Sequence, residues 1–223
     1  MAGIKKLWHI IRGIAGIATR IVIEVPHRLI INLFDTLFGF LNWPEKKLRI
    51  RIFILCDEQG NPVCSPVDPE ASITHAQKVF KKNFNVRLLP HHKESFVKIL
   101  PKKSCSEVLY TKGGPGALEE EFKIAGSFFA SNLSGVFYPV TAFVVIKIKG
   151  ACGCSLGPIS DYVTLDHFGA KQTSTLAHEL AHACGLWHVK KRSNLLYRYN
   201  DRQDEIEWWQ KNIFRSSRHI TYW

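Results

Sequence analysis

The stretch HELAHACGLWH, residues 178–188, carries the most specific pattern in this chain of 223 residues. Histidines four residues apart on a helix project from one face on successive turns, so the imidazoles of His178 and His182 can reach the same metal ion. Gly185 tolerates the left-handed backbone conformation that ends helices, and it lets the chain reverse at once. We expect this reversal to return His188 to the metal as a third ligand, which leaves one coordination position open.

Glu179 follows the first of these histidines, and it would lie beside the open position without binding the metal itself. A chain of this length contains the HExxH part by chance at roughly the one-in-a-hundred level, and the added glycine and histidine lower that by a further factor of roughly several hundred. Chance is therefore not the competing explanation. The competing hypothesis is a catalytically inactive protein that keeps the fold and the metal and serves in binding or interaction.

The full pattern HExxHxxGxxH resembles that of the metzincin clan of zinc metalloproteases. The similarity covers about residues 48–223 in layout and 173–197 in specific residues. It implies an α+β fold with a twisted mixed β-sheet, an active-site helix and a small C-terminal subdomain that ends in a helix. It also implies one catalytic zinc ion held by the three histidines, Glu179 as general base, and a protein or peptide substrate. Structural calcium and zymogen control are left open.

Metzincins also place a methionine in a tight turn beneath the metal, but the only methionine of this chain is Met1. The matching stretch is SNLLY, residues 193–197. In the matrixin-like alignment, which we favour, Leu196 takes the position of the methionine. In the astacin-like alignment Leu195 does, and Tyr197 aligns with a tyrosine that can bind zinc there. Exchanges of methionine and leucine in packed sites usually cost less than about 1.5 kcal/mol, so an apolar floor is kept.

The resemblance implies hydrolysis of peptide bonds by a zinc-bound water that Glu179 activates. Substrates of this clan add to the edge of the sheet as extended peptides through main-chain hydrogen bonds. By order along the chain, we expect this edge within residues 152–159, with Ser155, Leu156 and Gly157 as candidate substrate-binding residues.

Residues 1–45 differ from the rest, because polar and apolar side chains alternate there with helical periodicity and the polar face is basic. Charged residues interrupt the apolar run, so neither a spanning helix nor a cleavable signal peptide is predicted. Two interpretations stay open: this helix lies on an anionic membrane surface, or its apolar stripe packs against the protein's own body or a partner chain. Secretion or attachment to the cell surface is favoured over other locations.

A break at residues 42–44 (Asn-Trp-Pro) sets the expected boundary between this segment and a catalytic domain at 46–223. Alternation, β-branched runs and helix-start signals predict the elements of that domain. Strands are expected at 48–55, 85–89, 95–100, 142–149 and 161–165, helices from Asp68 to 84 and at 117–130, 173–184 and 204–214, and an irregular segment at 150–158.

The formal net charge of +11 is concentrated at the two ends of the chain. Residues 1–50 carry +5 and residues 189–223 carry +4, whereas residues 51–188 carry only +2. Because no nucleic-acid-binding motif accompanies this charge, a nucleic-acid partner is not expected. The six cysteines include no CxxC pair, which argues against a thiolate zinc site and leaves disulfides and free thiols as equal alternatives.

Overall fold

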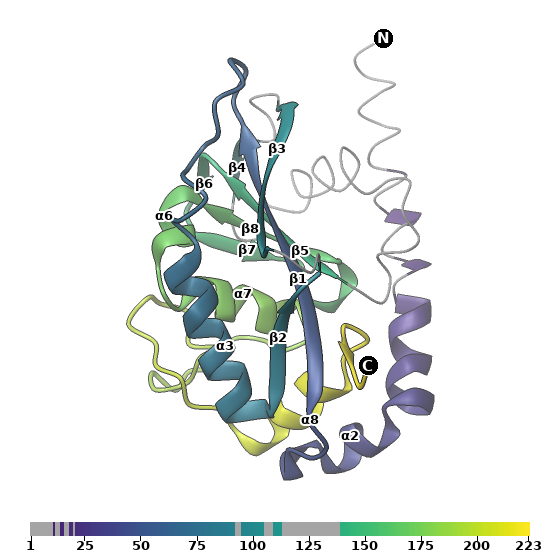
Figure 1. Cartoon of the computed structure of the whole chain (residues 1–223). Helices are drawn as coiled ribbons and strands as arrows, with labels where there is room; N and C mark the ends of the chain where they lie inside the picture. Colours follow the sequence, from purple (N-terminus) through teal and green to yellow (C-terminus); the bar gives the residue numbers. More distant parts are fainter. Residues whose placement is uncertain are drawn as a thin grey trace.

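The computed structural model describes residues 11, 14–15, 18–19, 21–91, 95–104, 109–112 and 139–223 (Figure 1). Its centre is the long strand β1 (Lys46–Cys56), whose side chains alternate between buried and half-buried along most of its length. Leu48, Ile50, Ile52 and Ile54 are fully buried. This alternation places every second side chain on the face that carries the main hydrophobic core, as expected for a strand with helices on that face.

The described part of the chain forms a mixed, mostly parallel sheet with strand order β2-β1-β5-β8-β7, and with β3 and β9 also paired to β1. The pairs that β1 makes with β2, β3 and β5, and the pair of β5 with β8, are parallel. In contrast, β7 and β9 run antiparallel to their neighbours. The bounds are β2 (Val86–Pro90), β3 (Val97–Lys103), β5 (Val140–Val145), β7 (Gly153–Ser155), β8 (Tyr162–Asp166) and β9 (Ile220–Thr221).

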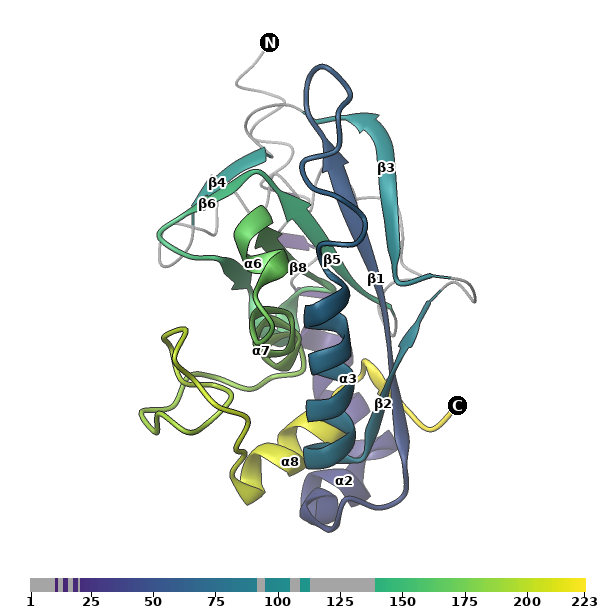
Figure 2. The ribbon, with the colours of Figure 1, turned by 60° about the vertical axis from the view of Figure 1, so that its left-hand side comes forward.

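Two helices that contact each other, α3 (Glu70–Phe84) and α7 (Thr175–Ala183), lie against the same face of this sheet (Figure 2). The short helix α6 (His167–Lys171) follows β8 directly and leads into α7. Apolar side chains from these helices and from the strands form one continuous core cluster, which includes Leu176, Leu180 and Phe80. The helix with the histidine motif is therefore held by the main core, and its position does not depend on a loop.

Helix α8 (Trp208–Ser216) closes the lower end of the molecule and begins with a capping box. The side chain of Glu207 accepts from the backbone of Gln210, and the side chain of Gln210 accepts from the backbone N–H of Glu207. This reciprocal pair satisfies two free amides, so the helix begins at Trp208. The sequence prediction placed its start at 204, which is too early by one turn.

Three further differences from the predicted elements have local causes. The strand predicted at 142–149 is divided into β5 and β6 (Lys147–Lys149), because the amide of Ile146 donates to Leu109 and β6 pairs with β4 (Tyr110–Lys112) in a separate small sheet. The segment predicted as irregular contains β7 and a 3₁₀ turn, η5 (Gly157–Ile159). Asp68 accepts from the preceding amide of Ser65 and does not cap α3. The helix predicted at 117–130 lies outside the described residues.

The N-terminal segment continues as helix over 21–26, then as the π-helix η1 (His27–Ile31), α2 (Leu33–Phe38) and the 3₁₀ turn η2 (Gly39–Leu41), which contact α8. The described members of the predicted apolar stripe, Ile11, Ile14 and Ile21, are 48–56% exposed. The protein's own body therefore leaves about half of each of these three side chains uncovered, and a membrane surface and a partner chain both remain as predictions. Among the described residues, no helix combines the length and the apolar character needed to cross a bilayer.

Candidate metal centre

Helix α7 ends in the reversal that the sequence predicts. Gly185 has φ +98°, its amide donates to the carbonyl of His182 at 2.8 Å, and the amide of Leu186 donates to the carbonyl of Ala181 at 3.0 Å. These two bonds are those of a Schellman motif, in which a left-handed residue ends the helix and satisfies its last carbonyls. The chain then returns along the helix, and His188 arrives beside the two histidines of α7.

Three imidazole nitrogens meet at this point. The Nε2 atom of His178 lies 3.0 Å from that of His182 and 3.2 Å from that of His188, and the Nε2 atoms of His182 and His188 are also 3.2 Å apart. The three residues form the group of His, Cys, Asp and Glu side chains that could hold a metal ion in the part of the chain that the structure describes. His178 is buried, His182 half-buried and His188 exposed, so the group opens to solvent on one side.

The other ring nitrogens fix the tautomer of two of these imidazoles. The Nδ1 atom of His178 lies 2.8 Å from the carbonyl of Leu195, and the Nδ1 atom of His182 lies 2.6 Å from the carbonyl of Leu186. A carbonyl only accepts, so both Nδ1 atoms carry the proton and both Nε2 atoms of the neutral rings present a lone pair. This is the arrangement in which metal-binding histidines are oriented by a backbone acceptor.

The electrostatic environment keeps the cluster neutral. Burial lowers the pKa of His178 to about 2 and that of His182 to about 4, and burial also lowers the pKa of His188. The positive charge of Arg202 acts in the same direction on all three rings. Neutral imidazoles are the form that binds a metal, so the site is prepared for a cation at ordinary pH.

The geometry fits a zinc ion. Zinc–nitrogen bonds of about 2.0–2.1 Å in a tetrahedral arrangement place two nitrogens roughly 3.3–3.4 Å apart, close to the three separations in this cluster. Two lone pairs that face each other at 3.0 Å repel, and a cation between them turns this repulsion into coordination. The imidazole donors suit zinc, copper, iron or nickel, and a site with three protein ligands leaves a position for water or substrate.

Glu179 lies against the backbone of β7. A Cβ atom added to Gly153 would come within 2.6 Å of the Oε1 atom of Glu179 and within 2.7 Å of its Cγ atom. Only glycine at position 153 leaves room for this carboxylate. Glu179 is buried, with 6% of its surface exposed. The sequence predicts Glu179 as a site residue but gives no sign of Gly153, because their contact joins segments that are far apart in the chain.

A cleft of about 1170 Å³ contains these groups. Its lining includes the three histidines and Glu179, together with the predicted substrate-binding residues Ser155, Leu156 and Gly157. Ser155 ends β7, which is the last strand in the order of the sheet among the described residues. The structure thus brings the predicted metal ligands and the predicted sheet edge to the same cleft.

Arg202 is a cleft residue that the sequence analysis missed. Its Nε atom donates to the carbonyl of Tyr199 at 3.1 Å and its Nη2 atom donates to the side chain of Asn200 at 2.9 Å, while its Nη1 atom is buried without a hydrogen-bond partner among the described residues. Burial lowers the pKa of this guanidinium and the negative charge of Glu179 opposes that shift. No local motif marks Arg202, since its loop reaches the cleft only through tertiary packing.

The turn that replaces the methionine turn lies in the core. Leu195 and Leu196 are both fully buried and belong to the main core cluster, and the amide of Leu196 donates to the side chain of Asn194 at 2.8 Å. Tyr197 is half-buried, with its ring 5.5 Å from that of Tyr199. Leucine at both positions therefore keeps the apolar packing expected of this turn. The cysteines nearby, Cys152, Cys154 and Cys184, form no disulfide among the described residues, and neither do Cys56 and Cys64.

No family model matches this sequence, and no curated protein matches it. Among solved structures, this chain is similar to the crystal structure of metalloproteinase-II from Bacteroides fragilis, with 15% sequence identity and a TM-score of 0.47. The similarity covers 71% of this chain and 49% of that protein, so this chain spans about half of its length. A similarity of this size does not indicate an activity for this chain.

Proposed function

We propose that this chain is a zinc-dependent endopeptidase of the metzincin type, in which His178, His182 and His188 bind one catalytic zinc ion and Glu179 is the general base. One observation carries the proposal: three Nε2 atoms converge at 3.0–3.2 Å inside a cleft that also holds a buried carboxylate. Within the clan we place it with the matrixin-like members, on the alignment that gives Leu196 the position of the methionine.

When bound, zinc supplies a Lewis acid for the scissile carbonyl and lowers the pKa of the attacking water. Glu179 takes a proton from that water and later delivers it to the departing amine. Gly153 keeps the carboxylate against β7, because any side chain there would displace it. The carbonyls of Leu195 and Leu186 hold two imidazoles in the tautomer that presents Nε2 to the metal.

The substrate in this proposal is an extended peptide that adds to the free edge of β7. This strand pairs with β8 through residues 153–155, and it has no partner on its other side among the described strands. Main-chain pairing at an edge recognises a peptide by its backbone, so a broad range of sequences is accepted unless side-chain pockets restrict it. Ser155, Leu156 and Gly157 are the residues we expect to contact it.

The test replaces Glu179 by alanine in the zinc-loaded chain. Hydrolysis of casein is expected to fall by a factor of about 100 to 10,000, the usual contribution of general acid–base catalysis, while the zinc content stays near that of the wild type. Glu58 offers a matched control, since it is an exposed glutamate in a surface turn, and Glu58→Ala should cleave casein at the wild-type rate.

Two outcomes would overturn the proposal. If Glu179→Ala cleaves casein as fast as Glu58→Ala, the carboxylate is not the base. If the zinc-loaded wild type cleaves nothing across a broad peptide library, the chain is an inactive metal-binding protein with this fold, the alternative that the sequence left open.

A further inference from the structure

Residues 21–43 turn their apolar side chains away from the protein. Every residue of this range that is exposed is apolar. Apart from Pro26, the exposed side chains are large and are between 40% and 77% accessible. We call them the outer face: Ile21, Val22, Val25, Leu29, Ile30, Ile31, Leu33, Phe34, Leu37, Phe38, Phe40, Leu41 and Trp43. In Figure 1 the segment stands at the right of the molecule, beside α8 and the C-terminal end.

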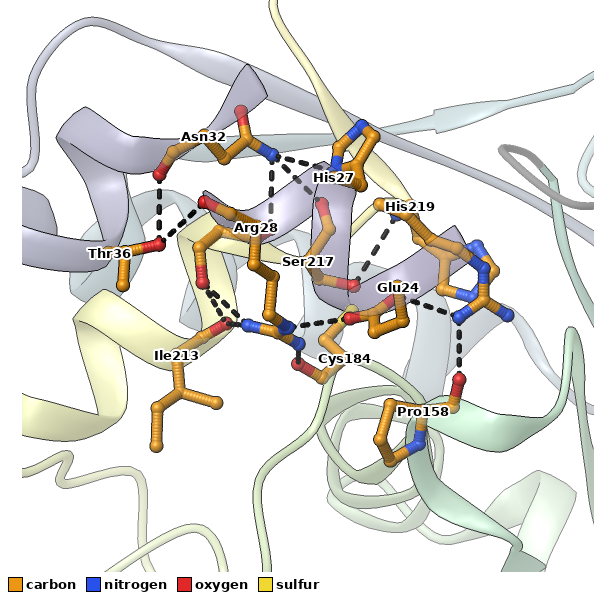
Figure 3. Close-up of polar contacts among 12 residues, drawn as sticks. Glu24, His27, Arg28, Asn32, Thr36, Pro158, Cys184, Ile213, Ser217 and His219 are labelled. Carbon is orange, nitrogen blue, oxygen red and sulfur yellow. Dashed lines mark hydrogen bonds and ion pairs between the residues drawn. The ribbon is translucent and has the colours of Figure 1, made fainter. Parts of the chain in front are cut away.

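The charged residues of the same segment and the polar Asn32 face the protein, and we call them the inner face: Glu24, Arg28, Asn32 and Asp35. Figure 3 shows Glu24, Arg28 and Asn32 directed toward the C-terminal part of the chain. Arg28 donates to the carbonyl of Ile213 and to the hydroxyl of Ser216, both at 2.5 Å. Asn32 donates to the carbonyl of Ser216 at 3.0 Å.

Two further groups of charges complete this inner face. The carboxylate of Glu24 accepts from Arg218 at 2.8 Å. The carboxylate of Asp35 accepts from Lys46 at 2.9 Å and from Arg215 at 2.8 Å, and all three of these side chains are fully buried. Buried ion pairs therefore fix the orientation of the segment. If the segment were turned over, Lys46, Arg215 and Arg218 would lose the carboxylates that neutralise them, at a cost of several kcal/mol.

A helix on the surface of a water-soluble protein has the opposite arrangement, with its apolar stripe on the core and its charges in water. Monomeric proteins rarely expose continuous apolar patches beyond about 300–600 Å² unless the patch binds something. The outer face follows successive helical turns for more than twenty residues, and Phe40 extends it to the exposed ring of Trp208 on α8 through an edge contact at 6.3 Å.

We propose that the outer face binds the surface of an anionic lipid bilayer, with its aliphatic side chains among the acyl chains. The chemistry that favours lipid is the charge pattern of the sequence: residues 1–20 carry Lys5, Lys6, Arg12 and Arg20 and no acidic residue. Basic residues that precede an apolar segment in the sequence are attracted by anionic headgroups when that segment binds a membrane, at about 1 kcal/mol for each near the surface. No exposed charge interrupts the outer face within 21–43, as contact with hydrocarbon requires.

The aromatic residues agree with this occupant. Phe34, Phe38, Phe40 and Trp43 gather at the C-terminal end of the segment, and the ring of Phe34 contacts those of Phe38 and Trp43. Tryptophan is enriched where a protein passes from hydrocarbon to headgroups. A face with an aromatic end and charges turned away from lipid is suited to lie in the plane of the interface.

The inner face connects this surface to the cleft. The Nη2 atom of Arg28 donates to the carbonyl of Cys184, the residue that ends α7, at 3.0 Å. Arg218, which pairs with Glu24, donates to the carbonyl of Pro158 in η5, beside the edge strand β7. A chain bound to lipid by its outer face would therefore hold the cleft at a fixed position above the bilayer.

The experiment measures co-sedimentation of the full chain with vesicles of phosphatidylcholine alone or with about 30% phosphatidylserine, a membrane that carries a negative surface potential. The wild type is expected to sediment with the anionic vesicles and less with the neutral ones. Ile30→Glu should lower the partition coefficient at least about tenfold, because an acidic side chain is expelled from hydrocarbon. Val67→Glu is the matched control, since Val67 is 62% exposed but lies outside this face, and it should bind as the wild type does.

The melting temperature of each variant is measured alongside vesicle binding. Leu37→Glu, on α2, is a second variant of the outer face. The proposal is overturned if both glutamate variants bind vesicles like Val67→Glu. It is also overturned if the wild type ignores vesicles and sediments as a dimer that Ile30→Glu dissociates, because a second copy then covers the face. A large loss of stability in Ile30→Glu and Leu37→Glu, with none in Val67→Glu, would assign the face to the chain's own interior and overturn it as well.

Discussion

Two clusters of ionisable side chains in the described part of the protein are built in opposite ways. Beside α7, three imidazoles of the same kind point their Nε2 atoms at one another at 3.0–3.2 Å. Under the N-terminal segment, Asp35 lies between the cations of Lys46 and Arg215 at 2.9 and 2.8 Å. Among the described residues, no opposite charge lies at the centre of the three imidazoles, whereas Asp35 is paired with Lys46 and Arg215.

This difference separates a ligand site from a structural anchor. Opposite charges that meet within one chain satisfy each other, and they favour one arrangement of the segments that carry them. The lone pairs of His178 and His182 face each other without an opposite charge between them, and a cation bound there would satisfy both. The three histidines should therefore bind metal and lose stability in acid. The charge cluster of Asp35, Lys46 and Arg215 should lose stability when one partner is removed.

The largest effect is expected when one imidazole is removed from the histidine cluster. His182→Ala leaves two ligands, so the zinc content should fall from about one ion per chain to near zero, and casein hydrolysis should disappear with it. Metal analysis after dialysis measures the first effect. His75→Gln is the control, because His75 pairs with Asp204 at the surface and lies outside the cluster. Equal zinc contents in the two variants would contradict the assignment of the ligands.

Removal of one partner from the charge cluster should cost about 3–5 kcal/mol of unfolding free energy, because it leaves a buried charge with incomplete pairing. Arg215→Met is the variant, since Arg215 is fully buried against Asp35. Arg192 forms a salt bridge of similar length with Asp201, but its side chain is 72% exposed, so Arg192→Met should cost only about 0–1 kcal/mol. Urea unfolding compares them, and similar losses would remove the distinction between the anchor and a surface pair.

Acid should destabilise the metal-free protein through the histidine cluster. The folded-state pKa values of His178 and His182, about 2 and about 4 because of burial, lie below the value of about 6.5 for an unfolded chain. The unfolded state thus binds more protons between these values, and the unfolding free energy should fall as the pH is lowered from 6.5 toward 4, by about 1 kcal/mol per pH unit for each ring.

Urea unfolding at three pH values in this range measures the slope for the wild type and for a variant with leucine at both positions. The unfolding free energy of the variant should depend less steeply on pH, because the contributions of His178 and His182 to the slope are removed. Parallel slopes would mean that the two imidazoles are not held neutral in the folded protein.

The smallest of these effects concerns the position of Glu179. Gly153→Ala places a methyl group within 2.6 Å of its carboxylate, so the side chain has to move away from β7. Activity should fall about 10- to 100-fold, as is usual when a supporting contact of a metal site is lost, while zinc content and thermal stability stay near those of the wild type. Unchanged activity would show that the carboxylate does not need this contact.

The sequence determined the parts of the site that depend on local geometry. The spacing of four residues between His178 and His182 places both rings on one face of any helix, and Gly185 permits the left-handed turn that brings back His188. The edge of the sheet was expected within residues 152–159 from their order along the chain, although the strand β7 inside this range was not predicted. All of these inferences use positions that are close in the chain, where backbone geometry leaves few alternatives.

Tertiary structure decided the rest. The contact of Gly153 with Glu179 and the place of Arg202 in the cleft join segments that no local pattern connects. The periodicity of the N-terminal segment showed which of its residues share a face, but not which face meets the protein. That choice depends on Lys46, Arg215 and Arg218, whose charges reach Asp35 and Glu24 only in the folded chain, because a buried charge takes the orientation that gives it a partner.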